Sequence, residues 1–232
     1  MEYIETGFFR HHLEVFLEFR SVLWESTLET LYMTFATVTM AYAIGLPLGM
    51  FLVCLGKGGL FPNRAVHAPL SFVINTTRSI PFLILLVALI PFSRLIVGSG
   101  IGNNAAIVAL VVAAAPFIAR MVETALNEVD VGVVDAAKSM GANNFQIMFK
   151  VLLPESIPSL IRGFSITTIN IMSFSAMAGV IGAGGLGRLA IRYGINFWRY
   201  DIMLIIIIVI VIIVTIIQFL FNLLATKIDR RI

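Results

Sequence analysis

Long apolar stretches without charged residues divide the chain. Asp, Glu, Lys and Arg are absent from residues 30–56, 95–119, 163–187 and 202–226, and residues 65–93 contain only Arg78. The hydrocarbon core of a bilayer is about 30 Å thick, so a helix needs about 20 apolar residues to cross it. Each of the five stretches is long enough. The pattern therefore predicts an all-α integral membrane protein with five transmembrane helices.

The N-terminal segment before the first span has a different pattern. Within residues 8–20 the apolar side chains recur at helical spacing while the charged ones take other positions; the apolar ones are Phe9, Leu13, Phe16 and Leu17. This pattern is typical of an amphipathic helix that lies in the membrane interface. We expect an N-terminal amphipathic extension (1–26), a membrane domain (27–220) and a C-terminal tail (221–232).

Composition supports the membrane assignment and excludes several other classes. The chain is 59% hydrophobic and 12% charged, whereas soluble domains carry about 25% charged residues. The net charge of +3 comes from scattered basic residues, which argues against binding to nucleic acid. A single cysteine, Cys54, excludes an internal disulfide and a multi-cysteine metal site. We expect no cofactor and no metal.

The longest polar region lies between Arg120 and Arg162 and carries nine charges. Asp130 is suited to cap a short helix, and Gly141 to the left-handed residue that ends it. Asn143 and Gln146 form a pattern like a capping box at the start of a second short helix, which Pro154 is expected to end. The apolar face of this second helix is expected to hold Phe145, Met148, Phe149 and Leu152. We therefore expect a helix–turn–helix loop on which a partner docks.

Within this loop the sequence resembles the permeases of ABC importers. Their signature, E-A-A, three residues, G, nine residues and I-x-L-P, is matched with two conservative departures, Asp for Glu and Val for Ile; the matching positions are Asp135, Ala136, Ala137, Gly141, Val151, Leu153 and Pro154. The resemblance implies the type I ABC importer permease fold. It also implies that the loop, about residues 130–155 and including Ala142, is a cytoplasmic coupling helix that contacts an ATPase.

Longer segments are similar to the permease subunits of bacterial methionine importers. They are RSIPFLILLVALIPF (78–92), AAPFIARMVETAL (114–126), VLLPESIP (151–158) and SAMAGVIGAGGLG (175–187). The resemblance covers about residues 28–220. It implies a homodimer in the bacterial inner membrane, a pair of ATPase subunits and an extracytoplasmic methionine-binding (lipo)protein that delivers D- or L-methionine. A permease for another small amino acid or derivative is the alternative.

The distribution of basic residues favours one orientation. If the loop around residues 130–155 is cytoplasmic, alternation places the N-terminus outside and the C-terminus inside. Nine of the lysines and arginines then lie inside and six outside, in agreement with the positive-inside rule.

The segment GAGGLG has the G-x-G-x-x-G spacing of a dinucleotide-binding loop, formed by Gly182, Gly184 and Gly187. A dinucleotide-binding loop needs a surrounding βαβ unit and an acidic residue about 20 positions later. Here the three glycines instead follow an apolar span. We expect a tight re-entrant or interhelical turn in which glycine permits close packing.

Two features inside the spans are candidates for the transport pathway. Arg78 is costly in a bilayer unless it faces protein or water, or extends to the interface, and both alternatives stay open. In the fourth span, Gly163, Thr167, Asn170, Phe174 and Met177 fall within about 80° on a helical wheel. Met177 is suited to a flexible apolar gate. Helix–helix packing is the alternative reading of this stripe.

Catalytic residues are not recognisable in the sequence. There are three histidines, no nucleophile in a known setting and no paired carboxylates within a span. We expect a non-catalytic transport subunit that is driven by a separate ATPase. A self-sufficient secondary transporter or channel would need carboxylates in its spans or an inverted repeat, and an intramembrane enzyme would need a catalytic set there.

Overall fold

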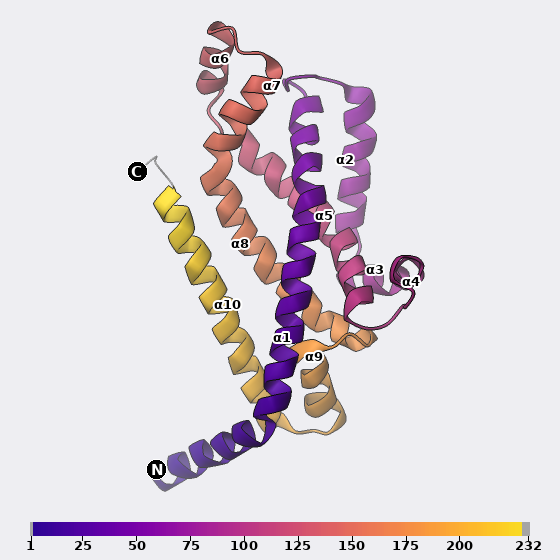
Figure 1. The fold of residues 1–232 in the computed structure, drawn as a ribbon, viewed down its shortest axis with the longest axis vertical. Helices are drawn as coiled ribbons and strands as arrows, with labels where there is room; N and C mark the ends of the chain where they lie inside the picture. Colours follow the sequence, from indigo (N-terminus) through magenta and orange to yellow (C-terminus); the bar gives the residue numbers. More distant parts are fainter. Residues whose placement is uncertain (1, 229–232) are drawn as a thin grey trace. The chain divides into compact units, whose positions relative to one another are not determined.

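Helices make up all the regular structure of the described residues. The computed structural model describes residues 2–228, so Met1 and the end of the expected tail, 229–232, lie outside it (Figure 1). The α-helices are α1 (Glu2–Leu55), α2 (Arg64–Ser79), α3 (Phe82–Ala88), α4 (Ile90–Val97), α5 (Asn103–Asn127), α6 (Val131–Ser139), α7 (Asn144–Ile147), α8 (Leu153–Ala178), α9 (Gly185–Ala190) and α10 (Tyr200–Ile228). Three other helical segments join them: η1 (Met148–Leu152), η2 (Gly179–Ile181) and η3 (Ile191–Asn196).

The predicted spans correspond to long helices, with one exception. Among the described residues, four helical segments are long and apolar enough to cross a membrane: Arg10–Leu55, Asn103–Asn127, Asn144–Ile181 and Tyr200–Ile228. The second predicted span is broken into α2 and α3, and it makes a fifth crossing only if the two count together. Pro81 explains the break, because proline lacks an N–H and disfavours the helical conformation of the preceding residue. Ile80 is extended accordingly, with φ −80° and ψ 128°.

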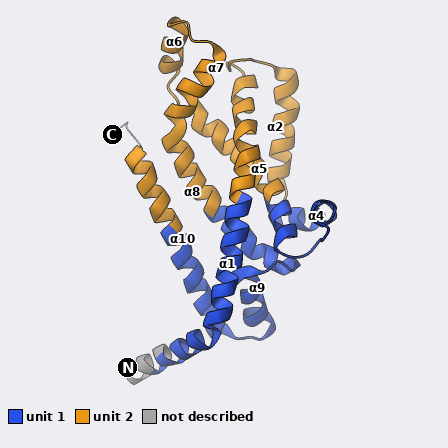
Figure 2. Cartoon of the chain, in the orientation of Figure 1, with its two compact units in different colours: residues 1–37, 82–110, 169–216 blue, residues 38–81, 111–168, 217–232 orange. Residues whose placement is uncertain are grey.

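The chain is divided into two compact units, each built from separate segments (Figure 2). Unit 1 consists of residues 1–37, 82–110 and 169–216, and unit 2 of residues 38–81, 111–168 and 217–232. The helices α1, α5, α8 and α10 each contribute residues to both units. The polar loop with α6 and α7 therefore belongs to unit 2, and the glycine loop before α9 belongs to unit 1.

Each unit has an apolar core of its own. In unit 1, α1, α9 and α10 pack together through Val15, Leu23, Leu186, Leu189, Ile202, Ile205 and Ile206. In unit 2, α1, α2 and α5 meet at Leu52, Ile74 and Ala119. Close approach of α1 to α5 depends on Gly45 and Gly49, because a Cβ there would lie only 2.7 Å and 2.6 Å from the Cβ atoms of Ile118 and Val122. Small residues at helix contacts are typical of membrane proteins.

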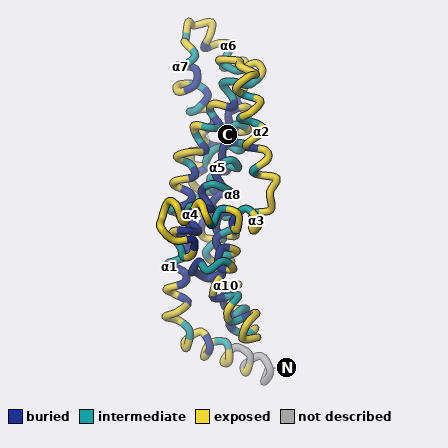
Figure 3. The backbone as a smooth tube through the Cα atoms, turned by 90° about the vertical axis from the view of Figure 1, so that its right-hand side faces the viewer, coloured by how far each residue is buried: buried dark blue, intermediate teal, exposed yellow. Residues whose placement is uncertain are grey.

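The N-terminal segment is continuous with the first span in α1. The described members of its expected apolar face, Leu13, Phe16 and Leu17, are exposed, while the side chain of Phe9 lies outside the described residues. Val15 and Leu23 are the residues buried against α9 and α10. Exposed residues along this part of α1 appear in yellow in Figure 3. The segment thus has two apolar faces, one packed on the protein and one open to the surroundings.

Candidate functional site

The first half of the polar loop is a short capped helix, as the sequence predicts. The Asp130 carboxylate accepts a hydrogen bond from the N–H of Gly132 over 2.6 Å and so caps α6. After α6, Gly141 takes a left-handed conformation with φ +84°. The N–H of Ala142 then donates to the carbonyl oxygen of Ala137 over 3.0 Å, which satisfies a carbonyl at the helix end. Both predicted ends of this helix are confirmed.

The second half begins as predicted and ends differently. The N–H of Asn143 donates to Gln146 Oε1 (2.9 Å) and the N–H of Gln146 donates to Asn143 Oδ1 (2.8 Å), which confirms the capping box. The expectation that Pro154 ends the helix is wrong, because α7 runs through the π-helical segment η1 into α8. Within η1 the bonds reach one residue further, as from Leu153 N–H to Met148 O, and Pro154 is the second residue of α8.

The residues of the importer signature do not gather on one surface. Asp135 and Ala136 are exposed on α6, and Asp135 lies 3.4 Å from the Lys138 ammonium. Ala137 is buried. The remaining positions vary: Gly141 and Pro154 are exposed, while Ala142 and Leu153 are half-buried. The signature therefore combines surface positions with positions that shape the loop.

The loop also exposes large apolar side chains. Met140 is 82% exposed, Val131 71% and Phe145 69%. The expected apolar face of the second helix is divided: Met148 and Leu152 are buried, whereas Phe145 and Phe149 are exposed and their ring centroids lie 4.5 Å apart. The sequence alone did not show which of these four apolar residues are buried and which are exposed. Exposed large apolar groups on a polar loop are typical of a surface that binds another protein.

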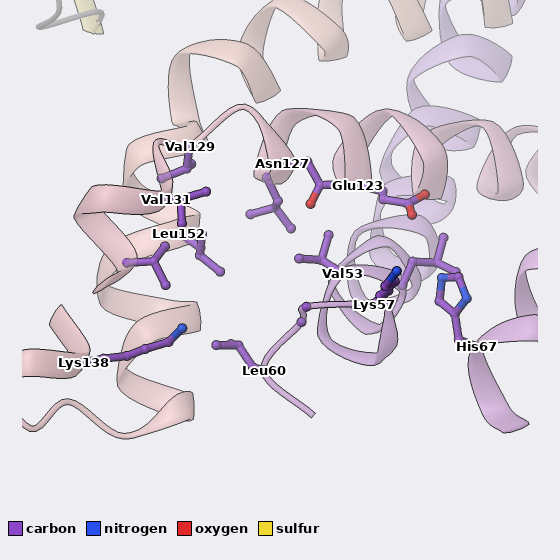
Figure 4. A pocket seen from close by; sticks show the side chains of 16 residues that line it. Val53, Lys57, Leu60, His67, Glu123, Asn127, Val129, Val131, Lys138 and Leu152 are labelled. Atoms are coloured by element: carbon purple, nitrogen blue, oxygen red, sulfur yellow. The ribbon is translucent and has the colours of Figure 1, made fainter. Parts of the chain in front are cut away.

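A hollow of about 350 Å³ lies in unit 2 beside this loop (Figure 4). Lys138 of α6 lies on one side, and Lys57 and His67 lie on the other, around the turn between α1 and α2. Leu60 in that turn is tied to the loop, because its carbonyl oxygen accepts a hydrogen bond from Asn144 Nδ2 (2.8 Å). The loop is therefore attached to the α1–α2 turn as well as to α5 and α8, between which it lies in the chain.

Two arginines join α2 to α5 in unit 2. Arg120 Nε donates to Asn75 Oδ1 (3.1 Å), Nη1 donates to Glu123 Oε2 (2.5 Å) and Nη2 donates to Ser71 Oγ. Arg78 is exposed in the last turn of α2, and its guanidinium carbon lies 5.8 Å from the centre of the Phe117 ring. This contact is a cation–π pair. Arg78 is therefore accessible, and its guanidinium group lies over the aromatic ring of Phe117.

The predicted stripe on α8 changes character along the helix. Thr167 is fully buried, and its hydroxyl donates to the carbonyl of Gly163 (2.8 Å) and lies 3.4 Å from Met121 Sδ. Asn170 is half-buried. Phe174 stacks on Phe82 of α3 with ring centroids 4.3 Å apart. Met177 is 47% exposed and lines a mostly apolar hollow of about 420 Å³ in unit 1. Only the later part of the stripe therefore borders open space.

The backbone donors of the glycine loop are used by side chains of the same chain. The N–H of Gly184 donates to Asn103 Oδ1 (2.6 Å) and the N–H of Gly185 donates to Glu29 Oε2 (2.6 Å). The loop thus holds an internal carboxylate where a dinucleotide-binding loop would hold a phosphate. The described residues contain no βαβ unit, since all their regular structure is helical. The close turn that the sequence predicts is what the structure shows.

Comparison with known proteins gives consistent matches over most of the chain. Residues 45–232 match the family described as "Binding-protein-dependent transport system inner membrane component". The chain is 46% identical over 210 residues to the probable D-methionine transport system permease protein MetI of Vibrio cholerae, covering 90% of this chain and 93% of that protein. It is 48% identical over 209 residues to the methionine import system permease protein MetP of Bacillus subtilis, covering 90% and 94%.

Solved structures of ABC transporters also resemble this chain. A chain of the MetNI methionine ABC transporter in an inward-facing conformation is 43% identical and superposes with a TM-score of 0.90, covering 92% of this chain and 99% of that one. A chain of an amino acid ABC transporter, at 23% identity and a TM-score of 0.72, shares the fold.

Proposed function

The chain belongs to the family of inner-membrane components of binding-protein-dependent transport systems, and we propose that it is the permease subunit of an ATP-driven importer of D- and L-methionine. The methionine transport permeases MetI and MetP match nine tenths of the chain at 46% and 48% identity. The chain has apolar helices long enough to cross a membrane several times. Methionine follows from the relatives, whereas the transport role also follows from the loop.

The observation that carries the role is the construction of the loop around residues 130–155. It has two capped helices, a left-handed Gly141 and exposed apolar residues such as Met140 and Phe145. A loop that is ordered by its own hydrogen bonds can transmit a movement of the ATPase without the entropic cost of ordering the loop at each step. We name residues 130–155 the coupling loop and assign it to the docking of an ATPase subunit, through Asp135, Ala136, Ala137, Gly141, Ala142, Leu153 and Pro154 and the exposed apolar side chains beside them.

The assembly in this proposal has several subunits. Two copies of the chain surround one pathway, a pair of cytoplasmic ATPase subunits binds the two coupling loops, and an extracytoplasmic binding protein delivers the amino acid. The chain performs no reaction of its own, and the free energy comes from ATP hydrolysis in the partner. In this arrangement the N-terminus is outside and the C-terminus is cytoplasmic.

The pathway is assigned to the stripe on α8, with Met177 as the gate. Met177 is exposed beside an apolar hollow. Phe174, which precedes Met177 on α8, stacks on Phe82. A narrow apolar constriction can exclude water by dewetting, and a thioether is flexible enough to yield to a passing side chain. Thr167 is buried against Met121 and does not border open space in this structure. We therefore assign Thr167 and Asn170 to the lining of the pathway in another state, in which α8 has moved away from α5. Arg78 is assigned to the pathway because it is accessible in α2, and the alternative to extension of its side chain to the interface is that it faces water or protein.

Copurification with a candidate ATPase tests this function. The chain is expressed with an ATPase encoded beside it, the complex is isolated in detergent, and hydrolysis is measured with and without the methionine-loaded binding protein. We expect a stable complex whose hydrolysis rises when the loaded binding protein is added. A chain that never binds an ATPase, or a complex that ignores the binding protein, would contradict the proposal.

A further inference from the structure

Glu29 makes a hydrogen bond to a distant glycine loop inside unit 1. It lies on α1 and accepts the N–H of Gly185 at 2.6 Å, across 156 positions of sequence. Its other carboxylate oxygen accepts a hydrogen bond from Asn103 Nδ2 at 3.2 Å. Asn103 in turn accepts the N–H of Gly184 at 2.6 Å, and Thr30 Oγ1 accepts the N–H of Leu186 at 2.9 Å. Three consecutive backbone donors are thus satisfied by three side chains.

The glycines are required by this arrangement. A Cβ on Gly184 would overlap the Glu29 carboxylate, and a Cβ on Gly185 would lie 2.6 Å from Thr30 Oγ1. Gly185 also has φ +85°, where other residues are strained. The helix α9 that follows has six residues and continues into η3. Its place is set by the core contacts of Leu186 and Leu189 together with the side chains that bind its first turn.

The same helix packs against the end of α8 and the start of η2 through backbone atoms. A Cβ on Gly187 of α9 would overlap the carbonyl oxygen of Ala176, and a Cβ on Gly179 would lie 2.5 Å from the backbone nitrogen of Arg188. Ala176 and Gly179 flank Met177 in the sequence. A continuous set of contacts therefore connects the Glu29 carboxylate, through α9, to the backbone that carries the Met177 side chain.

We propose that Glu29 is a positioning residue for the Met177 gate, a role that rests on the pathway assigned to α8 above. Its carboxylate accepts hydrogen bonds from both Gly185 and Asn103, and hydrogen bonds to a carboxylate are stronger than those between neutral groups. With the carboxylate in place, α9 is held against Ala176 and Gly179 and the thioether of Met177 is kept in its closed position. Without it, α9 keeps its core contacts but loses the anchor of its first turn, and the resulting shift of that turn opens the constriction.

The test is the leak of preloaded methionine from vesicles that contain the full complex, without ATP. Glu29→Gln keeps the size of the side chain, but its amide nitrogen is a donor and would face the N–H of Gly185 or the Nδ2–H of Asn103 in place of an acceptor oxygen. We expect the leak to rise about tenfold, which corresponds to losing one hydrogen bond to a charged group. The matched control is Glu25→Gln, an exposed position one turn earlier on α1, which should leak like the wild type.

A double variant separates positioning from general loosening. If Glu29 acts through Met177, the variant Glu29→Gln with Met177→Ala should leak no more than Met177→Ala alone, since effects on one element do not add. Multiplied effects of the two changes would overturn the positioning role, and so would a tight seal in Glu29→Gln when Met177→Ala leaks. If Met177→Ala itself is tight, the gate assignment fails and this inference fails with it, while the import function is judged separately by ATP-driven uptake.

A second variant covers the case in which Glu29→Gln does not assemble. Gly184 has φ −80°, so alanine is tolerated by the backbone there, and its methyl group would displace only the flexible end of Glu29. Gly184→Ala should therefore leak as Glu29→Gln does. A sealed complex with normal uptake in Gly184→Ala would count against the inference.

Discussion

Asn144 Nδ2 donates a hydrogen bond to the carbonyl oxygen of Leu60 over 2.8 Å, although 84 positions separate the two residues. Asn144 begins α7 in the coupling loop, and Leu60 lies in the turn between α1 and α2. That turn is held by its own backbone, through Phe61 N–H to Cys54 O (2.8 Å) and Asn63 N–H to Leu55 O (3.0 Å). The coupling loop is therefore attached to the turn that follows α1 as well as being continuous with α8.

The substitution Asn144→Asp tests this second attachment. It keeps the shape of the side chain but replaces the donor with a carboxylate oxygen that faces the Leu60 carbonyl. We expect about 1–3 kcal/mol of lost stability, seen as a lower melting temperature of the complex, and more ATP hydrolysed per methionine imported. The same change at the exposed Asn196 in η3, outside the coupling loop, should alter neither quantity. Unchanged coupling in Asn144→Asp would show that the attachment carries no movement.

Gly141→Asp tests the docking face of the coupling loop. Asp and Asn both tolerate the left-handed conformation, so Gly141→Asn is the matched neutral control. The aspartate places a charge next to the exposed Met140, and burying an unpaired charge on docking is costly. We expect affinity for the ATPase to fall at least about tenfold in Gly141→Asp, measured by titration, and to change little in Gly141→Asn. Equal affinities in the two variants would remove Gly141 from the interface.

Met177→Ala tests the gate itself. A methyl group fills less space than a thioether chain, so the seal weakens while the fold and ATPase binding are kept. Vesicles with the variant complex should lose preloaded methionine faster than the wild type in the absence of ATP. Unchanged efflux together with a lower melting temperature would identify Met177 as a packing residue.

The orientation is tested by cysteine labelling in a Cys54→Ser background. Met140 in the coupling loop and Ile195 after α9 are 82% and 60% exposed, so a cysteine at either position is accessible. In intact cells that express the chain without an ATPase, an impermeant thiol reagent should label Ile195→Cys and not Met140→Cys, and both should react after the membrane is opened. Labelling of Met140→Cys in intact cells would reverse the proposed topology.

Local features of the coupling loop were predictable, because each depends on neighbouring residues. The Asp130 cap, the left-handed Gly141 and the Asn143–Gln146 box follow from hydrogen bonds and steric limits within four positions. The π-helical segment η1 was not predictable in this way, since the sequence shows Pro154 as a helix breaker and gives no sign that the backbone bonds change register before it.

Features that depend on distant residues needed the structure. Pro81 was visible within the second span, but whether the helix bends or breaks there is decided by its surroundings. The partners of the glycine loop, Glu29 and Asn103, are 156 and 81 positions away from the glycines that bind them. No periodic pattern in the sequence links Glu29 or Asn103 to the glycines. The sequence therefore predicted a close turn but not the side chains that hold it. Burial of Val15 rather than Leu13 likewise depends on where α9 and α10 pack.

Uptake of labelled methionine into proteoliposomes tests the central claim most directly. The chain and its ATPase are reconstituted, the methionine-binding protein is supplied on one side, and ATP on the side of the coupling loop. We predict accumulation that requires ATP, the ATPase and the binding protein, and that unlabelled D- and L-methionine reduce by competition. Accumulation without ATP, or none for methionine while another amino acid enters, would contradict the account.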